Sequence, residues 1–205
     1  MGDEVYRVPP PRPGTRGPRL VENAHMKRHI ALLRGINVGK AKRVPMADLR
    51  ALMEALGYAN VRTLLNSGNA VFDAKGGTPA GHAKKLRAAI LEKTGVDCEV
   101  VVKTAADLAA AIAEHPLRRH AEDDARMQVM FMQDASALAE LKALEAGDWA
   151  PEAFAVGRHA AWLWCASGII ESRIAKAVGK VLKERGTARN WATVEKLQAM
   201  VDADG

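Results

Sequence analysis

The sequence contains few cysteines and no long apolar segment. Its two cysteines, Cys98 and Cys165, lie far apart in the apolar runs DCEVVV and AWLWCA, without a C-x-x-C motif. This excludes a disulfide framework and favours a reducing compartment. No apolar run approaches the roughly 18 residues that span a bilayer, and the opening segment lacks the apolar core of a signal peptide. We therefore expect a cytoplasmic protein that is neither secreted nor embedded in a membrane.

The motifs of two common nucleotide- and RNA-binding modules are also missing. The segment RGINVGKAKR has three residues between its glycines where a Walker motif has four, and Ala41 replaces the Ser or Thr that would hold magnesium. No RNP1-like string occurs, and Phe72 is the single aromatic residue on a predicted strand of the first half. The loop therefore argues against nucleotide hydrolysis, and RNA binding would lack the usual stacking platform.

Positive charge is present, and it is concentrated in the first half of the chain. The net charge is +6 and the isoelectric point is near 9.5. Residues 26–104 hold 14 Lys and Arg against 6 Asp and Glu, whereas residues 105–205 hold 12 against 15. The first half should therefore attract anionic partners.

Periodicity predicts a βαββαβ unit over residues 26–104. Residues 1–25 are rich in proline and are expected to be a disordered tail or sequence upstream of a true start at Met26. Alternating and helical patterns then predict strands at 28–36, 60–66, 69–74 and 97–103 and helices at 45–56 and 82–90. A Ser67-Gly68 turn joins the middle strands into a hairpin. This order is typical of a ferredoxin-like unit.

A second unit of the same kind is predicted over residues 126–205. Thr104 and Asp107 form a capping box for a helix at 105–115, which together with residues up to 125 links the two units. Strands follow at 127–132, 154–157 and 160–166, with helices at 138–144, 169–182 and, capped by Asn190, 190–201. This unit reads βαββα, without a strand after its last helix. The predicted fold is α+β: two tandem ferredoxin-like units with antiparallel sheets, plus a C-terminal helix.

Four segments resemble a known bacterial family. LLRGINVG (32–39), PMADLRALMEALG (45–57), VRT with SGNAVF (61–72) and ARNWATVEKL (188–197) are similar, in this order, to the family of unknown function DUF1697. The resemblance runs from Met26 to the end of the chain and implies two ferredoxin-like units, but it names no activity. The chain departs from the family pattern at Lys40, Leu64, Ala188 and Ala192, so a family site that used those side chains would be altered here.

The candidate ligand-binding residues lie in three polar segments. They are Arg34, Asn37, Lys40, Lys42 and Arg43 in the RGIN loop, Ser67 and Asn69 in the SGN turn, and Arg189 and Asn190 in the ARN segment. Clefts between domains are common ligand sites, so we expect these segments to converge there and bind a phosphate- or carboxylate-bearing ligand. A purely structural interpretation is also open, because Gly and Asn are typical of turns and Asn of helix caps.

No catalytic constellation is recognisable. The two cysteines read as buried thiols, and the acidic run beside His115 and His120 matches no metal-ligand spacing. Ser172 and Lys176 have helical i, i+4 spacing but lack a glycine-rich oxyanion loop. We predict no cofactor and no metal, and whether the protein is an enzyme stays open.

Three functions therefore compete. The first is binding of a small anion by the three segments, and the second is backbone-directed binding of RNA or single-stranded DNA by the basic first unit. The third is a structural or oligomeric role without a ligand. Affinity for a polyanion falls steeply as salt rises, whereas affinity for a small ligand in a partly buried cleft falls less, so salt dependence separates the first two.

Overall fold

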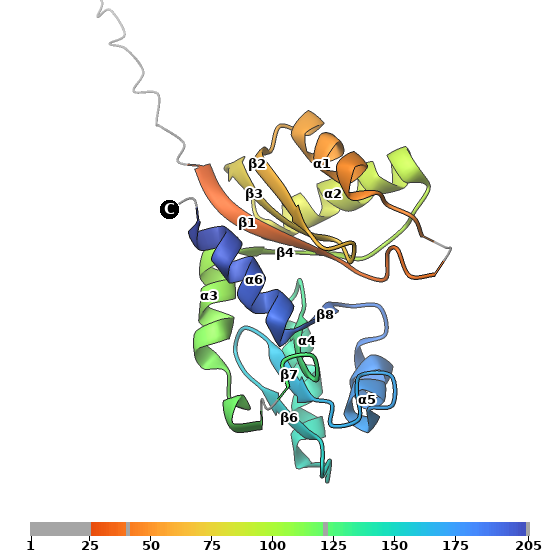
Figure 1. Cartoon of the computed structure of the whole chain (residues 1–205), viewed down its shortest axis with the longest axis vertical. Coiled ribbons are helices and arrows are strands. Elements are labelled where there is room, and N and C mark those ends of the chain that lie inside the picture. Colours follow the sequence, from red (N-terminus) through yellow and green to blue (C-terminus); the bar gives the residue numbers. More distant parts are fainter. Residues whose placement is uncertain (1–25, 40–41, 121–122, 204–205) are drawn as a thin grey trace, which may run out of the picture.

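The computed structural model describes residues 26–39, 42–120 and 123–203. The predicted N-terminal tail, residues 1–25, lies outside the described residues. Within the described ranges the chain is an α+β protein with two four-stranded antiparallel sheets and six α-helices (Figure 1). No helix in these ranges is long and apolar enough to cross a membrane.

The first sheet follows the predicted order of elements. The elements are β1 (Met26–Leu33), α1 (Met46–Ala55), β2 (Ala59–Leu64), β3 (Asn69–Lys75), α2 (Pro79–Thr94) and β4 (Val100–Thr104). The strands lie in the order β2-β3-β1-β4, so β1 is central and pairs with both β3 and β4. Both faces of β1 are buried, which explains its nearly continuous apolar run from Ile30 to Leu33.

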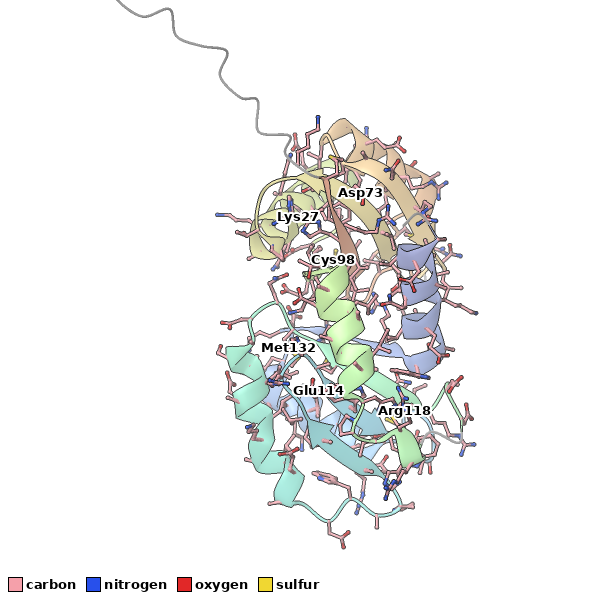
Figure 2. The ribbon with its side chains drawn as sticks, turned by 90° about the vertical axis from the view of Figure 1, so that its left-hand side faces the viewer. Lys27, Asp73, Cys98, Glu114, Arg118 and Met132 are labelled. Atoms are coloured by element: carbon pink, nitrogen blue, oxygen red, sulfur yellow. The ribbon has the colours of Figure 1, made fainter. Side chains whose placement is uncertain are left out.

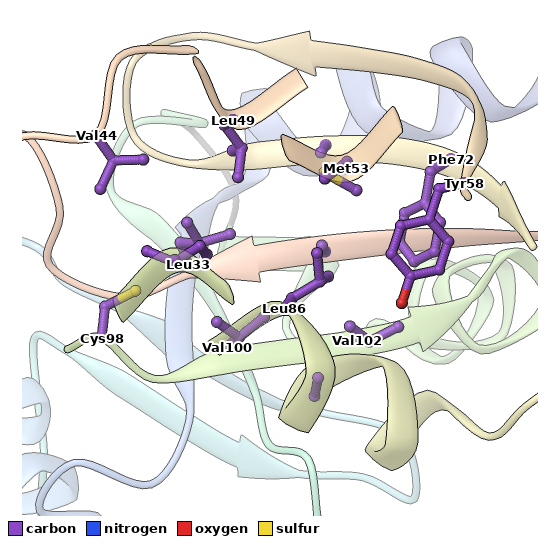
Figure 3. Close-up of a cluster of buried hydrophobic side chains, with 14 of the residues drawn as sticks. Leu33, Val44, Leu49, Met53, Tyr58, Phe72, Leu86, Cys98, Val100 and Val102 are labelled. Carbon is purple, nitrogen blue, oxygen red and sulfur yellow. The ribbon is translucent and has the colours of Figure 1, made fainter. Parts of the chain in front are cut away.

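Helices α1 and α2 cover one face of this sheet. The helical stripe places Leu49 and Met53 of α1 against Phe72 of β3, and Leu86 of α2 joins them in the same core (Figure 3). Cys98 lies in this core and is 3% exposed. The predicted buried position of this thiol is confirmed.

The second half of the chain forms a sheet with the same pattern of neighbours. Its elements are α3 (Ala105–Glu114), β5 (Met127–Phe131), α4 (Ser136–Leu141), β6 (Ala153–Val156), β7 (Ala161–Trp164), α5 (Arg173–Leu182), β8 (Thr187–Asn190) and α6 (Trp191–Asp202), with 3-10 turns at Arg118–His120 and Lys142–Ala146. The strand order is β6-β7-β5-β8. The capping box of α3 is confirmed, because the side chains of Thr104 and Asp107 each accept a hydrogen bond from the other's backbone N–H.

Two predictions for this half were wrong. Strand β8 follows α5, where no strand was expected, and it pairs with β5 from Gln128↔Asn190 to Phe131↔Thr187. Its four residues, TARN, are too short and polar to show an alternating pattern. Helix α5 begins at Arg173 instead of Ile169, because the Ser172 hydroxyl accepts a hydrogen bond from Ala175 N at 3.0 Å and so caps the helix there.

A core shared by both sheets lies around α3 and α6. It contains Leu32 and Val71 of the first sheet, Val129 and Trp162 of the second, and Val194 of α6. The two helices lie side by side between the sheets (Figure 2). The α3 segment, expected to link the units, therefore also helps to build the core that joins them.

Candidate functional site

Arg189 of β8 connects the two sheets. Its side chain reaches from the second sheet to the SGN turn of the first, where Nε donates to Asn69 Oδ1 and Nη2 donates to Leu33 O at 2.7 Å. Weaker contacts run from Nη2 to the carbonyls of Ser67 and Gly68, at 3.2 and 3.3 Å. Nη1 donates within β8, to Thr187 Oγ1 and to its neighbour's carbonyl. All three guanidinium nitrogens are thus engaged by the protein.

The Arg189 cation is buried without a carboxylate among its described partners. Its residue is 7% exposed, and burial lowers the pKa of Arg189 to about 10. The group stays protonated at neutral pH, with carbonyl and amide dipoles in place of water around it. Arg189 therefore serves as an internal crosslink, and its donors are not available to a ligand.

Asn37 and Asn69 are likewise used inside the fold. Asn37, at φ 56°, accepts from Val44 N and donates to Val44 O, which closes the RGIN loop. The same amide donates to Asn66 O at 2.8 Å and so ties this loop to the SGN turn. Asn69 is fully buried and donates to Leu64 O and to Ser67 Oγ. The hydrogen bonds of both asparagines therefore fit the interpretation that these residues stabilise turns.

Asn190 caps α6, as the sequence predicts. Its Oδ1 accepts from Thr193 N at 3.0 Å and from Thr193 Oγ1 at 2.6 Å, and the next residue, Trp191, is buried in the shared core. The RGIN loop, the SGN turn and the ARN segment do meet. However, Asn37, Asn69, Arg189 and Asn190 hold them together by internal hydrogen bonds.

Three basic residues of the RGIN loop have different positions. Arg34 is half-buried, and its Nη1 donates to Gly186 O at 2.8 Å. Lys42 and Arg43 are exposed, and Lys42 has a φ of 50°. Lys40, also a predicted site residue, lies outside the described residues. Of the predicted site residues that the structure describes, Arg34 is the one that borders both of the cavities described next.

The first cavity lies between α5 and the strands β5, β7 and β8. It measures about 310 Å³ and is lined by Arg34, Gln128, Met130, Leu163, Ile169, Ala175, Lys176, Gly179, Leu182, Thr187 and Ala188. Arg34 and Lys176 are its charged residues, and no acidic side chain is among these described lining residues. Most of the others are aliphatic. The cavity thus combines an apolar wall with two cations.

Sequence reasoning missed this cavity except for Arg34. Lys176 was considered only as a partner of Ser172, but its Nζ lies 3.7 Å from Glu171 Oε2, while Ser172 caps the helix. Gly179, inside the amphipathic helix α5, is the signal that could have pointed here. A Cβ at Gly179 would meet no atom within 4 Å, so the position opens onto free space.

The second cavity is polar and its charges compensate one another. It measures about 480 Å³ and is lined by Arg34, Gly35, Lys42, Arg87, Gly95, Val96, Asp97, Cys98, Glu99 and Glu184. The Arg87 side chain donates hydrogen bonds to Asp97 at 2.7 Å and to Glu99 at 2.9 Å. The bond to Asp97 lowers the pKa of that carboxyl group. Burial raises the pKa of the Cys98 thiol to about 11, so no nucleophilic thiolate is present at neutral pH.

His115 is a buried residue of the shared core. Its ring lies 4.5 Å from the Trp191 ring and stacks on Trp162 at 6.1 Å, measured between centroids. Burial lowers the pKa of His115, and Arg118 contributes in the same direction. Across the described ranges, no group of three or more His, Cys, Asp or Glu side chains is placed to hold a metal ion.

The structure thus defines an α+β protein whose two antiparallel sheets share a core and are crosslinked by a buried arginine, with a largely apolar cavity that carries two cations between the second sheet and α5. The chain belongs to the family described as "Protein of unknown function (DUF1697)", whose model matches residues 26–162. This match includes the RGIN and SGN segments and ends before ARNW.

A solved structure shares this fold. It is described as "The structure of conserved bacterial protein SP0830 from Streptococcus pneumoniae", and it is 24% identical to this chain with a TM-score of 0.72. The alignment covers 86% of this chain and 99% of that chain. At this identity the likeness concerns the fold alone. No curated protein matches the chain.

Proposed function

We propose that the protein binds a small organic anion, carrying a carboxylate or phosphate, in the cavity between α5 and β5, β7 and β8. One observation carries the proposal: two cations, Arg34 and Lys176, line a cavity whose described lining contains no acidic side chain. Such a combination favours a negatively charged ligand, because its charge has partners and its remaining surface has an apolar wall.

Arg34 is well suited to hold the anionic group. The one hydrogen bond that its side chain makes among the described residues, from Nη1 to Gly186 O, fixes the guanidinium near the cavity. The remaining N–H groups keep a planar arrangement that matches a carboxylate or phosphate. Lys176 is exposed and only loosely paired with Glu171, so it can turn toward a bound anion. This assignment moves the anion away from the SGN turn and from Arg189 and Asn190, whose side chains make hydrogen bonds inside the fold.

We also propose that each sheet with its helices is a ferredoxin-like unit. The support is the shared strand order, in which the first strand of each set lies between its third and fourth. On this proposal the first unit spans residues 26–104, the second spans 126–205, and residues 105–125 connect them. The two buried free thiols suit a cytoplasmic location.

Calorimetric titration and thermal shift test the proposed binding. Acetate, succinate, inorganic phosphate and a sugar phosphate would be compared at two salt concentrations, with Arg34→Gln as the test variant. A ligand present at about 100 times its Kd should add roughly 2.7 kcal/mol of stability. We expect a shift that survives moderate salt and is lost in Arg34→Gln.

Arg43→Gln is the matched control, because it removes the same charge from the same loop at an exposed position that borders neither cavity described above. Equal losses in the two variants would contradict the proposed site. Shifts from RNA or single-stranded DNA alone, fading steeply with salt, would instead support the polyanion alternative. No response to any anion would leave a structural or oligomeric role.

A further inference from the structure

We infer that the anion bound in this cavity carries an unbranched aliphatic chain, so that the ligand is an alkyl carboxylate of the fatty-acid type. This inference rests on the proposed function, because it assigns the Arg34 end of the cavity to the carboxylate. It adds a chemical class for the part of the ligand that Arg34 does not touch.

Most of the wall of the cavity is formed by aliphatic and thioether side chains. Met130 and Leu163 come from adjacent strands β5 and β7, Leu182 and Ala175 from α5, and Ile169 from the loop before α5. No aromatic side chain is among these described lining residues, so a nucleobase would find no stacking partner. Aliphatic and thioether side chains instead fit methylene groups, which need contact area and no directional partner.

The shape of α5 leaves room for such a chain. Gly179 lies within the helix, where glycine lowers stability relative to alanine, and a Cβ there would meet nothing within 4 Å. It faces the cavity between Ala175 and Leu182, which are one turn away on either side. A leucine at this position would enter the space that we assign to the chain.

The mouth of the cavity is apolar as well. Ile169 is 45% exposed and its neighbour Ile170 is 80% exposed, in the turn that precedes the Ser172 cap. Ile169, which lines the cavity, loses contact with water when an alkyl chain lies against it. The cavity volume, about 310 Å³, is at the small end of known ligand sites, which favours a single chain of medium length.

Chain length gives the decisive measurement. Acetate, butanoate, hexanoate, octanoate and decanoate would be titrated into the full chain at constant ionic strength, below micelle-forming concentrations. Calorimetry and methyl-group NMR would follow the binding. Each methylene buried in the cavity should tighten binding about fourfold, the factor that corresponds to ~0.8 kcal/mol. The gain should stop once the chain reaches the mouth at Ile169. Methyl signals of Met130 and Leu163 should shift with the longer acids.

Gly179→Leu separates this inference from the proposed function. We expect it to abolish the gain with chain length while acetate and phosphate binding at Arg34 stay within about twofold. Lys180→Leu is the control, because it adds a leucine to the next, exposed position of α5, outside the described lining. It should keep the length dependence.

The other outcomes are equally distinct. Affinity independent of chain length would overturn the alkyl-chain inference and leave the proposed anion site standing. A length dependence unchanged in Gly179→Leu, or equal for octanol and octanoate, would place the chain elsewhere and overturn the inference too. Failure of every carboxylate and phosphate to bind would overturn both.

Discussion

At the scale of single residues, the buried side chain of Arg189 is held by six hydrogen bonds. It carries a charge into the interior and meets only neutral acceptors there, from the end of β1, the SGN turn and β8. Desolvating a guanidinium is costly, so these acceptors must all be in place for the charge to be tolerated. The position of the SGN turn and the position of β8 are therefore set by the same group.

We predict that Arg189→Met lowers the free energy of unfolding by about 2–4 kcal/mol, because hydrogen bonds to a charged group are lost and buried acceptors such as Leu33 O lose their donor. Urea unfolding followed by circular dichroism measures this loss. Arg43→Met, at an exposed position, should change stability by about 0.5 kcal/mol or less. A loss below about 1 kcal/mol in Arg189→Met would contradict the crosslinking role.

His115 should make the protein sensitive to mild acid. Both ring nitrogens are buried without a hydrogen-bond partner in the described structure, and burial lowers the pKa of the ring. The unfolded state therefore binds a proton at a higher pH, near 6.5, than the folded state does. The contribution of neutral His115 to the free energy of unfolding is therefore complete above that pH. It is lost as the pH falls toward the lower pKa of the folded state.

We expect His115→Phe to reduce the fall in stability between pH 7.5 and 5.5, because phenylalanine keeps the ring against Trp162 and Trp191 but has no proton to bind. Unfolding free energies at several pH values measure the slope. His120→Phe, at an exposed position, serves as the control and should leave it unchanged. If the unfolding free energy of His115→Phe changed with pH as steeply as that of the unaltered protein, the pKa of His115 would be the same in the folded and unfolded states, which would contradict this prediction.

In the three polar segments, contacts between neighbours in the chain could be predicted from the sequence, and contacts between distant residues could not. The turn and cap chemistry of Asn69 and Asn190 could be predicted, because it depends on neighbours in the chain. The partner of Arg189 could not, since Asn69 lies 120 residues away and is brought there by tertiary packing. The same holds for the cavity, whose lining comes from three strands, a helix and two loops.

At the scale of elements, α5 and β8 are where the structure differs most from the sequence-based prediction. In the sequence, Ile169 and Ile170 continue the apolar pattern of α5 toward its N-terminus. In the structure, Ser172 caps the helix, so that α5 begins at Arg173 and both isoleucines lie in a turn. β8 is stabilised by pairing with β5 and not by an apolar pattern of its own. Longer elements, such as α2 and β3, carry enough periods for their type to be predicted.

Glycine substitutions test the local roles within these elements. Gly179→Ala should raise stability by up to about 1 kcal/mol, because alanine is the better helix former and the added methyl group meets no neighbour. Gly68→Ala should lower stability, because Gly68 has a φ of +79° and a Cβ there would lie 2.7 Å from Leu33 Cβ. Thermal unfolding compares the two. A stabilised Gly68→Ala protein would contradict the described turn.

At the scale of the whole molecule, the two sheets are bound into one structure by the core around α3 and α6. Both helices contribute side chains to a cluster that also holds residues of β1, β3, β5 and β7. Neither sheet can bury this face by itself. The predicted tandem arrangement accounts for the order of elements, but it gave no indication that the units share their interior.

We predict a single unfolding transition in denaturant. The four tryptophans all lie beyond residue 126 and report on the second half of the chain, including α6, whereas labelling of buried Cys98 reports on the first sheet and its helices. Because the shared core couples the sheets, the tryptophan fluorescence midpoint and the Cys98 labelling midpoint should coincide. Separate midpoints would mean that the sheets unfold independently.

The place of α6 in the chain order also bears on synthesis of the protein. Arg28 of β1 donates to Val201 O at the end of α6, across 173 residues, and α6 completes the core that β1 begins. While the chain is still growing on the ribosome, the inner face of the first sheet is covered only in part, by α3, because α6 has not yet been made. Ile30, Leu32 and Val71 on this face are then open to chaperones or to other nascent chains until the last described helix leaves the exit tunnel.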